Sequence, residues 1–549
     1  MGMGMGAGVH AGIQAGAGHG TLGQASALAC ALRFEGQQWS YQQLHSASCQ
    51  LAARLQALGL QSGQRVAYLG YAQPLQIALL FACAQLGAVL VPLNFRLSSA
   101  EWAGVLADCT PKLLLHDAHW ADAAQQLAQT CGLQHYEINS ILRPYDADIG
   151  LKNLEKTAAQ PLELPVLLVY TSGTTGKPKG AVHTQANLLA NMRIASAVQG
   201  ITAQDVVLTV LPLFHVGGLC IQTLPALYAG ACVLLHSRFD AAATLRAIAH
   251  DRPTLTLQVP ATLKALTEHA AWQTTDISSL RTLWVGSSVV PRALIEAFSQ
   301  RGVAVCNVYG STETGPFSIA IPPGSAHLPQ MALLGACGWP APQVELELAD
   351  VRVEAGDTAA YAQNAAELGN PDVAQLLGVQ REVSEVSKAS EASKASMVGE
   401  VCLRGPNVAQ RYWPNIAAVD ARGFFHTGDL ARLAPDGSIC IIGRAKDMVI
   451  SGGENIYPAE LEQLLATHPM VADCAVLGLP DAQWGEALVA VVVADAGATD
   501  IAALEAQLQA LLAGQLARYK LPKRWVWLSA LPKTALGKVQ KSVLAASLA

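Results

Sequence analysis

A short stretch at residues 170–180, YTSGTTGKPKG, concentrates side chains that could bind a phosphate. Gly173 and Gly176 let the backbone approach a ligand closely, and the hydroxyl and backbone N–H groups can donate hydrogen bonds. Lys177 and Lys179 add positive charge. Only two residues separate Gly173 from Gly176, whereas a Walker A loop has four residues before its Gly-Lys pair, so the loop is not of that kind. Its composition alone leaves a plain surface loop as the alternative.

The overall composition restricts the classes of function. With 549 residues the chain exceeds the roughly 250–300 residues at which one hydrophobic core stops growing, so we expect at least two domains. Its 41 acidic and 35 basic residues give a net charge of −6, which disfavours a general nucleic-acid binder. The 12 cysteines include no Cys-x-x-Cys pair and no zinc spacing. We therefore expect a reduced, cytoplasmic chain without a structural metal site.

Three segments stand apart from the predicted domains. Residues 1–24 carry no basic residue before an apolar run, and we interpret them as a disordered tail rather than a secretory signal. The apolar run 75–95 is interrupted by polar residues, which predicts a buried helix followed by a strand and not a membrane span. Residues 351–396 are rich in Ala, Ser, Glu and Lys, and this composition predicts a solvated, low-complexity insertion.

The remaining chain alternates apolar, strand-like runs with amphipathic helical stretches. The runs cover 165–172, 205–213, 231–237 and 280–286. This alternation predicts an α/β fold whose large N-terminal domain, 25–443, consists of stacked sheets and helices. Residues 447–549 have strands and helices of their own, which predicts a small, mobile C-terminal α+β domain.

Five further motifs follow the 170–180 loop in a fixed order. They are LPLFHVGG at 211–218, VYGSTETG at 308–315, GFFHTGDLARL at 423–433, IGRAKDMVISGGENIYPAELE at 442–462 and LPKTALGKVQK at 531–541. Together the six motifs resemble those of the adenylate-forming superfamily, which includes acyl-CoA synthetases, luciferases and peptide-synthetase adenylation domains. The resemblance spans most of the chain, interrupted by the insertion. It implies activation of a carboxylic acid with ATP and Mg²⁺.

The resemblance assigns a role around ATP to each matched residue. The phosphates would lie against Thr171, Ser172, Gly173, Thr174, Thr175, Gly176 and Lys179. The adenine and the α-phosphate would be contacted by Tyr309, Gly310, Ser311 and Thr312. Glu313 would bind Mg²⁺, for which a carboxylate oxygen is a suitable hard ligand. Asp429 would accept hydrogen bonds from both ribose hydroxyls, and Arg444 would reach the ribose as well; a structural ion pair is the plain alternative for either residue.

Lys538, in LGKVQK, is the predicted catalytic lysine. When a carboxylate attacks the α-phosphate two anions meet, and a lysine between them offsets both the repulsion and the charge that develops in the transition state. Lys533 and Lys541 are close in sequence, and only the Gly-Lys context favours Lys538. These lysines belong to a basic C-terminal segment, which suits a polyanionic small molecule or is an ordinary basic surface. The predicted catalytic set also includes Thr312, Glu313 and His215.

A small domain that carries Lys538 must close over the large domain to reach ATP. The resemblance implies a hinge at 444–446, with Lys446 as the pivot about which the small domain turns after adenylation. It further implies that Gly452 and Gly453 then line the tunnel for the thiol of CoA. A plain interdomain linker is the alternative.

The carboxylic acid is expected to bind among small and apolar side chains. His215 matches an aromatic position that gates the acyl pocket in the family, with a buried core histidine as the alternative. The other predicted lining residues are Gly217, Gly286, Ser287, Gly310 and Gly315. No Asp lies between Leu211 and Gly230, where peptide-synthetase domains hold an amino group. An uncharged fatty or aromatic acid is therefore favoured.

These features predict an ATP-dependent carboxylic acid–CoA ligase. A carboxylate and ATP would give acyl-adenylate and pyrophosphate, and CoA would then displace AMP. The expected partners are the acid, ATP, Mg²⁺ and CoA, without nucleic acid or a membrane span; the oligomeric state stays open, a homo-oligomer included. The alternatives are an acyl-AMP ligase that serves a carrier protein, a luciferase-like oxygenation, and a non-catalytic adenylate-binding homologue.

Overall fold

The computed structural model describes residues 27–142, 160–171, 178–287, 290–323, 336–348, 398–434, 436–444, 447, 449–451, 454–481, 485–516, 518–534 and 537–548. Several predictions fall outside these residues: the tail 1–24, the insertion 351–396, the loop residues Ser172, Gly173, Thr174, Thr175 and Gly176, and the three residues Lys446, Gly452 and Gly453.

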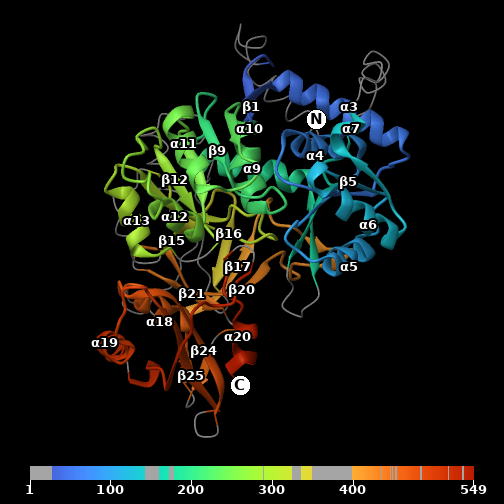
Figure 1. The fold of residues 1–549 in the computed structure, drawn as a ribbon. Coiled ribbons are helices and arrows are strands. Elements are labelled where there is room, and N and C mark those ends of the chain that lie inside the picture. Colours follow the sequence, from blue (N-terminus) through green and yellow to red (C-terminus); the bar gives the residue numbers. More distant parts are fainter. Residues whose placement is uncertain are drawn as a thin grey trace, which may run out of the picture.

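The longest sheet runs through one lobe of the large domain, drawn in green, and on into the strands beneath it (Figure 1). Its strand order is β16 (Glu345–Leu348), β17 (Val398–Arg404), β20 (Phe425–Leu433), β21 (Ile439–Arg444), β15 (Ala336–Pro340), β14 (Ile319–Ala320), β13 (Ala304–Tyr309), β12 (Thr282–Val285), β11 (Leu255–Gln258), β9 (Val206–Thr209), β10 (Cys232–Leu235), β1 (Cys30–Phe34) and β2 (Gln37–Ser40). The strands from β13 to β1 pair in parallel, whereas those from β16 to β14 pair antiparallel.

A second sheet forms the other lobe, drawn in blue and cyan in Figure 1. Its order is β19 (Ile416–Ala417), β18 (Arg411–Tyr412), β8 (Lys179–Thr184), β7 (Pro165–Thr171), β4 (Val89–Leu93), β3 (Arg65–Leu69), β5 (Leu113–His116) and β6 (Gln134–Glu137). β7 and β8 form an antiparallel hairpin, and β18 joins the edge of β8 from far along the chain. The chain therefore passes from β17 in the long sheet to β18 in the second sheet and back to β20, which links the two sheets.

Helices cover both sheets. In the large domain they are α3 (Tyr41–Ala57), α4 (Pro74–Leu86), α5 (Ser99–Cys109), α6 (Ala121–Cys131), α7 (Ile138–Ile141), α9 (Gln185–Gln199), α10 (Leu224–Tyr228), α11 (Ala241–Asp251), α12 (Pro260–Thr267), α13 (Arg292–Ser299) and the short η2 (Ala118–Trp120) and η3 (Gly217–Thr223). Reciprocal capping boxes start α3 at Ser40, α5 at Ser98 and α9 at Thr184. Left-handed glycines end α4 at Gly87 and α9 at Gly200.

The sequence-based strands and the apolar run are confirmed, with shorter bounds for some strands. The run 165–172 becomes β7 and the run 205–213 becomes β9, which ends at Thr209 because the next residues leave the sheet. The run 75–95 folds as the buried helix α4 and the strand β4, as predicted. Within the described residues, no helix combines the length and the apolar character needed to cross a membrane.

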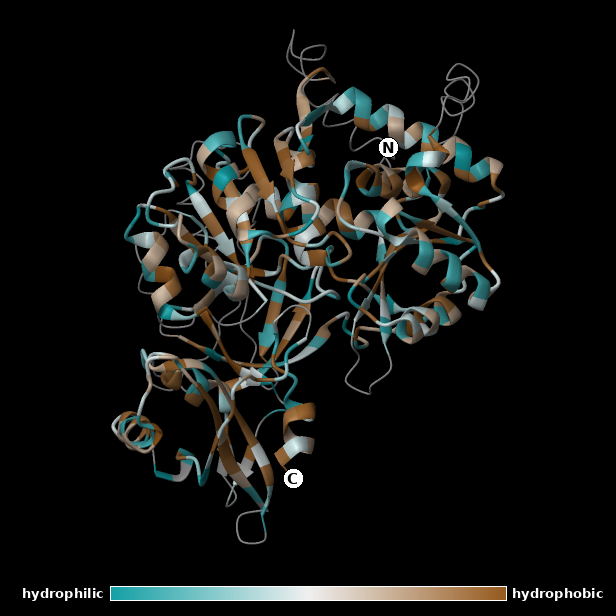
Figure 2. Cartoon of the chain, in the orientation of Figure 1, coloured by the Kyte–Doolittle hydropathy of each residue, from teal (hydrophilic) through white to brown (hydrophobic). Residues whose placement is uncertain are grey.

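The C-terminal part of the chain builds its own sheet and cores, drawn in red (Figure 1). The elements are β22 (Val449–Ser451), β23 (Glu454–Ile456), α18 (Pro458–Leu465), β24 (Val471–Asp481), β25 (Gly485–Ala494), α19 (Ile501–Ala513), η5 (Arg518–Lys520), β26 (Arg524–Trp527) and α20 (Lys541–Leu548). Leu461 and Leu508 pack on one side of β25, and Leu544 packs on the other. In Figure 2 the long strands of this sheet are drawn largely brown, the hydrophobic end of the scale. The fold is a large α/β domain plus a small α+β domain, as predicted.

Candidate active site

Several predicted site residues lie at one edge of the long sheet. β9, β11, β12 and β13 pair in parallel, so their carboxyl ends meet at the same edge. His215 follows β9, Gly286 follows β12 and Gly310 follows β13. Ligands of open α/β sheets bind outside the carboxyl ends of the strands. The edge is therefore the candidate site.

Three of the motifs meet at Asp429, two of them on neighbouring strands and one more than 100 residues earlier in the chain. Asp429 on β20 lies opposite Arg444 on β21 in the strand register, and its Oδ1 is 2.7 Å from Arg444 Nε. The hydroxyl of Tyr309, at the end of β13, donates to Asp429 Oδ2 over 2.7 Å. Burial, and then the charge of Asp429, raise the pKa of Tyr309 well above its usual range, so the phenol remains a donor. The structure thus brings together the predicted adenine and ribose residues around a carboxylate that is 7% exposed.

A second carboxylate lies in the loop after β13. Thr312 and Glu313 are both buried there, and the hydroxyl of Tyr412 on β18 donates to Glu313 Oε1 over 2.8 Å. Burial and the charge of Glu313 raise the pKa of Tyr412, so this hydroxyl also stays protonated. Lys179 Nζ lies 5.5 Å from the centre of the Tyr412 ring, within the range of a cation–π contact. A glutamate, a phenol and a lysine from three segments therefore adjoin one another.

The phosphate-loop motif connects β7 to β8. Thr171 ends β7 and Lys179 begins β8, and the two residues are register partners in the hairpin. The Thr171 hydroxyl donates to the carbonyl of Lys179 over 3.4 Å. Lys179, at the start of β8, therefore lies beside Tyr412 of the neighbouring strand β18.

The predicted acyl-pocket residues occupy positions where the chain passes close to itself. A Cβ at Gly310 would lie 1.8 Å from the carbonyl oxygen of Pro316, and one at Gly286 would lie 2.9 Å from that of Val308. Gly315 has φ +105°, a conformation that a side chain would strain. Ser287 has φ +78°, in the left-handed region that few residues other than glycine adopt.

His215 stands beside these glycines after β9. The backbone N–H of Gly217 donates to His215 Nδ1 over 3.1 Å, so in the neutral ring the proton is on Nε2. Burial lowers the pKa of His215 to about 4, which makes the neutral ring the state at physiological pH. The adjacent Phe214 packs edge-on against Phe95, with ring centroids 5.1 Å apart. The Arg96 guanidinium lies 5.5 Å from the centre of the Phe95 ring, so this aromatic pair has a cation beside it.

Lys538 lies in a tight turn of the small domain. The N–H of Thr534 donates to the carbonyl of Lys538 over 2.7 Å, and the N–H of Gly537 donates to the carbonyl of Thr534 over 2.8 Å. A Cβ at Gly537, which has φ +80°, would lie 3.5 Å from Cβ of Ala261, in the first turn of α12 after β11. The turn therefore contacts the large domain at the edge that carries the site, and Lys538 is exposed there.

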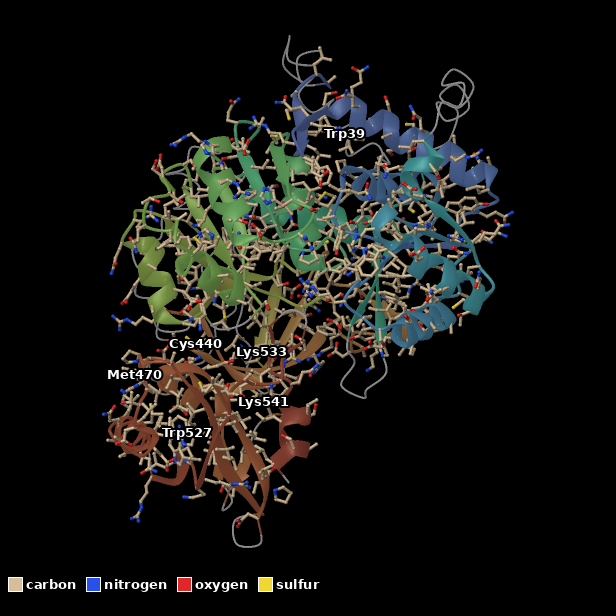
Figure 3. All side chains as sticks on the ribbon, in the orientation of Figure 1. Trp39, Cys440, Met470, Trp527, Lys533 and Lys541 are labelled. Carbon is tan, nitrogen blue, oxygen red and sulfur yellow. The ribbon has the colours of Figure 1, made fainter. Side chains whose placement is uncertain are left out.

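The two neighbouring lysines are held inside the small domain. Lys533 Nζ lies 2.5 Å from Asp473 Oδ2, and Lys541 Nζ lies 2.7 Å from Glu462 Oε1. Lys541 also donates to the carbonyl of Val476 over 2.9 Å. Both lysines are labelled in Figure 3. Their partners give each of them a structural role that the sequence could not distinguish from catalysis.

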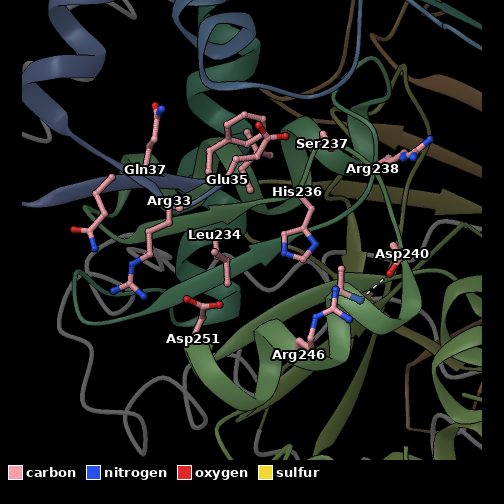
Figure 4. Close-up of a pocket in the computed structure, with 15 residues that line it drawn as sticks. Arg33, Glu35, Gln37, Leu234, His236, Ser237, Arg238, Asp240, Arg246 and Asp251 are labelled. Carbon is pink, nitrogen blue, oxygen red and sulfur yellow. Dashed lines mark hydrogen bonds between the residues drawn. The ribbon is translucent and has the colours of Figure 1, made fainter. Parts of the chain in front are cut away.

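A cavity of about 660 Å³ lies away from these residues, between the β1–β2 hairpin, the end of β10 and α11 (Figure 4). Charged side chains of both signs line it, among them Arg33, Arg246 and Asp251. His236, also in its wall, follows β10 and donates its backbone N–H to Thr209 on β9. Of the predicted site residues that the structure describes, none lines this cavity.

Sequence reasoning missed two residues that shape the site. Tyr412 is the partner of Glu313. Asn407, fully buried, donates from its side-chain amide to the carbonyl of Thr314 over 2.6 Å and packs against Gly315. The available signal was the stretch GPNVAQRYW at 405–413, which resumes ordered sequence after the insertion but has no chemical pattern of its own.

Comparisons with known proteins identify the family of this chain. Residues 23–358 match the model of the AMP-binding enzymes, and residues 460–538 match the model of the AMP-binding enzyme C-terminal domain. An indoleacetate–CoA ligase of Aromatoleum aromaticum is 40% identical over 522 residues, which cover 93% of each chain. A feruloyl-CoA synthase of Amycolatopsis is 37% identical, covering 93% of this chain and 94% of the relative. A fatty acid–[acyl-carrier-protein] ligase of Streptomyces coeruleorubidus is 32% identical, covering 94% of this chain and 92% of the relative.

Solved structures share the whole fold. ATP-bound MatB from Rhodopseudomonas palustris has a TM-score of 0.78 and 28% identity, covering 95% of this chain and 96% of MatB. The o-succinylbenzoate CoA synthetase of Bacillus subtilis, in complex with ATP and a magnesium ion, has a TM-score of 0.75 and 26% identity, covering 97% of this chain and 98% of the synthetase. The two family models, the full-length relatives and the shared fold show that the chain belongs to the AMP-binding, adenylate-forming enzymes.

Proposed function

We propose that this AMP-binding enzyme is an ATP-dependent ligase that joins an aromatic carboxylic acid to CoA. The class of reaction follows from the family and from relatives that are named as CoA ligases. The match to these relatives extends over nearly the full length of each protein. The observation that carries the proposal is the meeting of Tyr309, Asp429 and Arg444 at the edge that the Lys538 turn contacts.

ATP would bind along this edge with its ribose at Asp429 and Arg444. The carboxylate of Asp429 can accept both ribose hydroxyls once the phenol of Tyr309 gives up its hydrogen bond. The triphosphate would extend toward the β7–β8 loop and Lys179. Charge complementarity supports this direction, because a lysine and a buried carboxylate suited to a cation lie together there.

The residues present fit a magnesium ion at Glu313. Glu313 is 9% exposed, and its carboxylate accepts a hydrogen bond from the neutral phenol of Tyr412. Among the described residues, no arginine or lysine forms an ion pair with it. A hard oxygen ligand in that setting suits Mg²⁺, which usually binds through one carboxylate together with phosphate oxygens. When bound, the ion would neutralise the charge of the phosphates.

In the first half-reaction a carboxylate oxygen of the acid attacks the α-phosphorus, and pyrophosphate leaves. Lys538 would stabilise the charge that develops between the two anions, and Thr312 would orient the α-phosphate. The adenylate turns the acid's oxygen into a good leaving group, AMP. In the second half-reaction the thiol sulfur of CoA attacks the acyl carbon, the C–O bond to AMP breaks, and the thiol proton goes to solvent.

The aromatic class of acid is supported by the wall around His215. The His215 ring is neutral, and the adjacent Phe214 packs against Phe95, so these side chains offer aromatic surface to an acid. Relatives named for the aromatic acids indoleacetate and ferulate are 40% and 37% identical, against 32% for the relative named for a fatty acid. Both observations favour an aryl side chain.

A panel of acids tests this proposal. Indoleacetate, phenylacetate, ferulate and decanoate are each incubated with ATP, Mg²⁺ and CoA, and acyl-CoA, AMP and pyrophosphate are quantified by mass spectrometry. We expect kcat/KM for at least one aryl acid to exceed that for decanoate by about tenfold or more, since apolar pockets discriminate by roughly 10–200-fold. A preference for decanoate would contradict the aromatic assignment, and the absence of thioester with every acid would contradict the ligase.

Transfer to a carrier protein is the second candidate, because one relative is named as a fatty acid–[acyl-carrier-protein] ligase. The same panel is repeated with a phosphopantetheinylated carrier protein in place of CoA. The CoA proposal predicts a higher kcat/KM with CoA than with the carrier. Accumulation of acyl-adenylate with CoA, followed by rapid transfer to the carrier, would favour the second candidate instead.

A further inference from the structure

A cluster of metal-binding side chains lies on β17 and β20, the strand pair that carries Asp429. Glu400, Cys402 and His426 each offer one ligand atom, and these atoms lie within 4.8 Å of one another. His426 Nδ1 is 3.1 Å from Glu400 Oε2 and 3.4 Å from Cys402 Sγ. In a tetrahedral zinc site, bond lengths of about 2.0–2.3 Å place neighbouring ligand atoms about 3.3–3.6 Å apart. The two distances from His426, 3.1 Å and 3.4 Å, are close to those values, and all the ligand atoms lie within 4.8 Å of one another.

The backbone explains why these side chains converge. Cys402 on β17 and His426 on β20 are direct register partners in the antiparallel ladder. The register shifts between Glu400 and Cys402, and Gly428, with φ +70°, lies in the extra length of β20. A bulge of this kind re-aims side chains. It turns Glu400, two residues before Cys402, toward the same His426.

Outer partners already orient two of the ligands. The backbone N–H of Gly428 donates to Glu400 Oε1 over 2.8 Å, which leaves Oε2 on the side of His426. His426 Nε2 lies 3.5 Å from Asp420 Oδ2, and Asp420 is itself fixed by the N–H of Arg422, which donates to Oδ1 over 2.9 Å. A carboxylate on the far nitrogen of a histidine is the usual outer partner of a metal-bound imidazole.

The surroundings favour a cation. Carboxylate oxygens of Glu400 and Asp420 lie 3.1 Å and 3.5 Å from the two ring nitrogens of His426. A carboxylate oxygen, an imidazole nitrogen and a sulfur together form a donor set that a borderline-soft divalent ion accepts. The His426 side chain is 46% exposed, so an ion can reach the buried sulfur from solvent.

We propose that Glu400, Cys402 and His426 bind one borderline-soft divalent transition metal ion, with zinc as the natural occupant. The ion would be separate from the magnesium ion at Glu313. Binding replaces the thiol proton of Cys402, which goes to solvent, and a water fills the fourth position. The linear spacing of Cys and His in the sequence did not reveal this site, because its ligands come from two strands that lie 24 residues apart at Cys402 and His426.

The ion would fasten the strands beside the predicted ribose carboxylate. Thr427 follows His426, donates its hydroxyl to the carbonyl of Val401 on β17, and accepts the N–H of Asp429 over 3.0 Å. A metal that joins Glu400 and Cys402 to His426 would brace the same stretch of β20. Metal binding is therefore expected to raise the thermal stability of the folded chain.

Cobalt titration of the full-length, tag-free chain tests the proposal. The protein is stripped with a chelator and titrated with Co²⁺, whose thiolate complexes give a charge-transfer absorption band and, when tetrahedral, intense visible d–d bands. We expect one equivalent to bind, with both bands, and Zn²⁺ to displace it. Zn²⁺ alone should raise Tm of the stripped protein. The absence of a thiolate band or of a Zn²⁺-dependent Tm shift would overturn the proposal.

Matched variants assign the ligands. Cys402→Ser should abolish the charge-transfer band, whereas Cys440→Ser, at a buried cysteine on the neighbouring β21, should leave it unchanged. His426→Gln, at an exposed position, should abolish stoichiometric binding, and Asp420→Asn should weaken it by about 10–100-fold. A band that persists in Cys402→Ser, or that disappears in Cys440→Ser, would overturn the assignment. Mg²⁺-dependent adenylation is not part of the readout, so the test stands apart from the proposed function.

Discussion

The groups proposed to act on ATP occupy two contrasting settings. In the large domain Asp429 and Glu313 are buried, and each already has a protein partner, Tyr309 and Arg444 for the first and Tyr412 for the second. In the small domain the proposed catalytic lysine is exposed in a turn whose Gly537 lies against Ala261 of the large domain.

The large and the small domain would therefore contribute differently to stability and to activity. Buried, hydrogen-bonded groups support the fold as well as the ligand, because removal of one partner leaves the other unsatisfied. An exposed group in a turn adds chemistry with little effect on stability. Substitutions in the large domain should therefore affect both stability and activity, whereas substitution of the exposed lysine should affect activity alone.

The largest expected effect is that of Lys538→Ala on adenylation. Loss of one group that stabilises transition-state charge typically costs about 10²–10³ in rate, and Tm should stay unchanged. Acid-dependent pyrophosphate release measures the rate. The matched control is Lys533→Ala, which breaks a half-exposed ion pair with Asp473 and should change the rate by less than about fivefold. Equal losses in the two variants would erase the contrast between the domains.

Asp429→Ala should impair both properties. It removes the partner of Arg444 and of the Tyr309 hydroxyl, which should destabilise the large domain by about 1–3 kcal/mol and raise KM for ATP. Thermal unfolding and ATP-dependent kinetics give the two readouts. Asp276→Ala breaks the exposed pair with Arg252 and the hydrogen bond from the N–H of Ser278, and it serves as the control, with a smaller loss of Tm expected. An Asp429→Ala protein with wild-type Tm would show that the site does not support the fold.

Tyr412→Phe tests how much the hydrogen bond to Glu313 contributes to adenylation. The variant keeps the ring near Lys179 and removes only the hydrogen bond to Glu313, so we expect a decrease in adenylation of roughly tenfold or less. The dependence of the rate on Mg²⁺ concentration should shift in parallel. A Tyr412→Phe rate and Mg²⁺ profile identical to wild type would remove Tyr412 from the site.

The smallest expected effect concerns pH. A histidine in the unfolded chain has a pKa near 6.5, whereas burial lowers the pKa of His215 to about 4 in the folded chain. Above about pH 6.5 its contribution is intact; between pH 6.5 and 4 the unfolded chain binds a proton that the folded chain does not, so stability falls as pH falls. His215→Phe should reduce the loss of Tm at pH 5 by about 2–4 °C. An unchanged pH dependence would show that His215 is not held neutral by burial.

The sequence predicted some parts of this picture better than others. Asp429, Arg444 and Tyr309 were predictable because each stands in a specific motif, and the alternation of apolar runs predicted the parallel part of the long sheet. The antiparallel extension through β14, β15 and β21, which brings those motifs together, was not predictable from local patterns. A short strand such as β14 carries no periodicity.

The partner of Glu313 was out of reach for the same reason. Tyr412 pairs with it only because β18 crosses to the edge of β8, and 99 residues separate the two side chains. The site at Glu400 and Cys402 also depends on a register shift that no spacing rule encodes. Contacts made by cross-strand pairing after long excursions are visible only in the folded chain.

The proposal that Lys538 acts in adenylation alone is tested by measuring the second half-reaction of the Lys538→Ala variant separately. Lys538→Ala protein is given synthetic acyl-adenylate of the preferred acid together with CoA, and thioester formation is followed in a single turnover. We expect a rate of thioester formation within about threefold of wild type, because Lys538 is proposed to stabilise only the transition state of adenylation. Loss of thioester formation to the same degree as adenylation would contradict the claim that this exposed residue serves the first step alone.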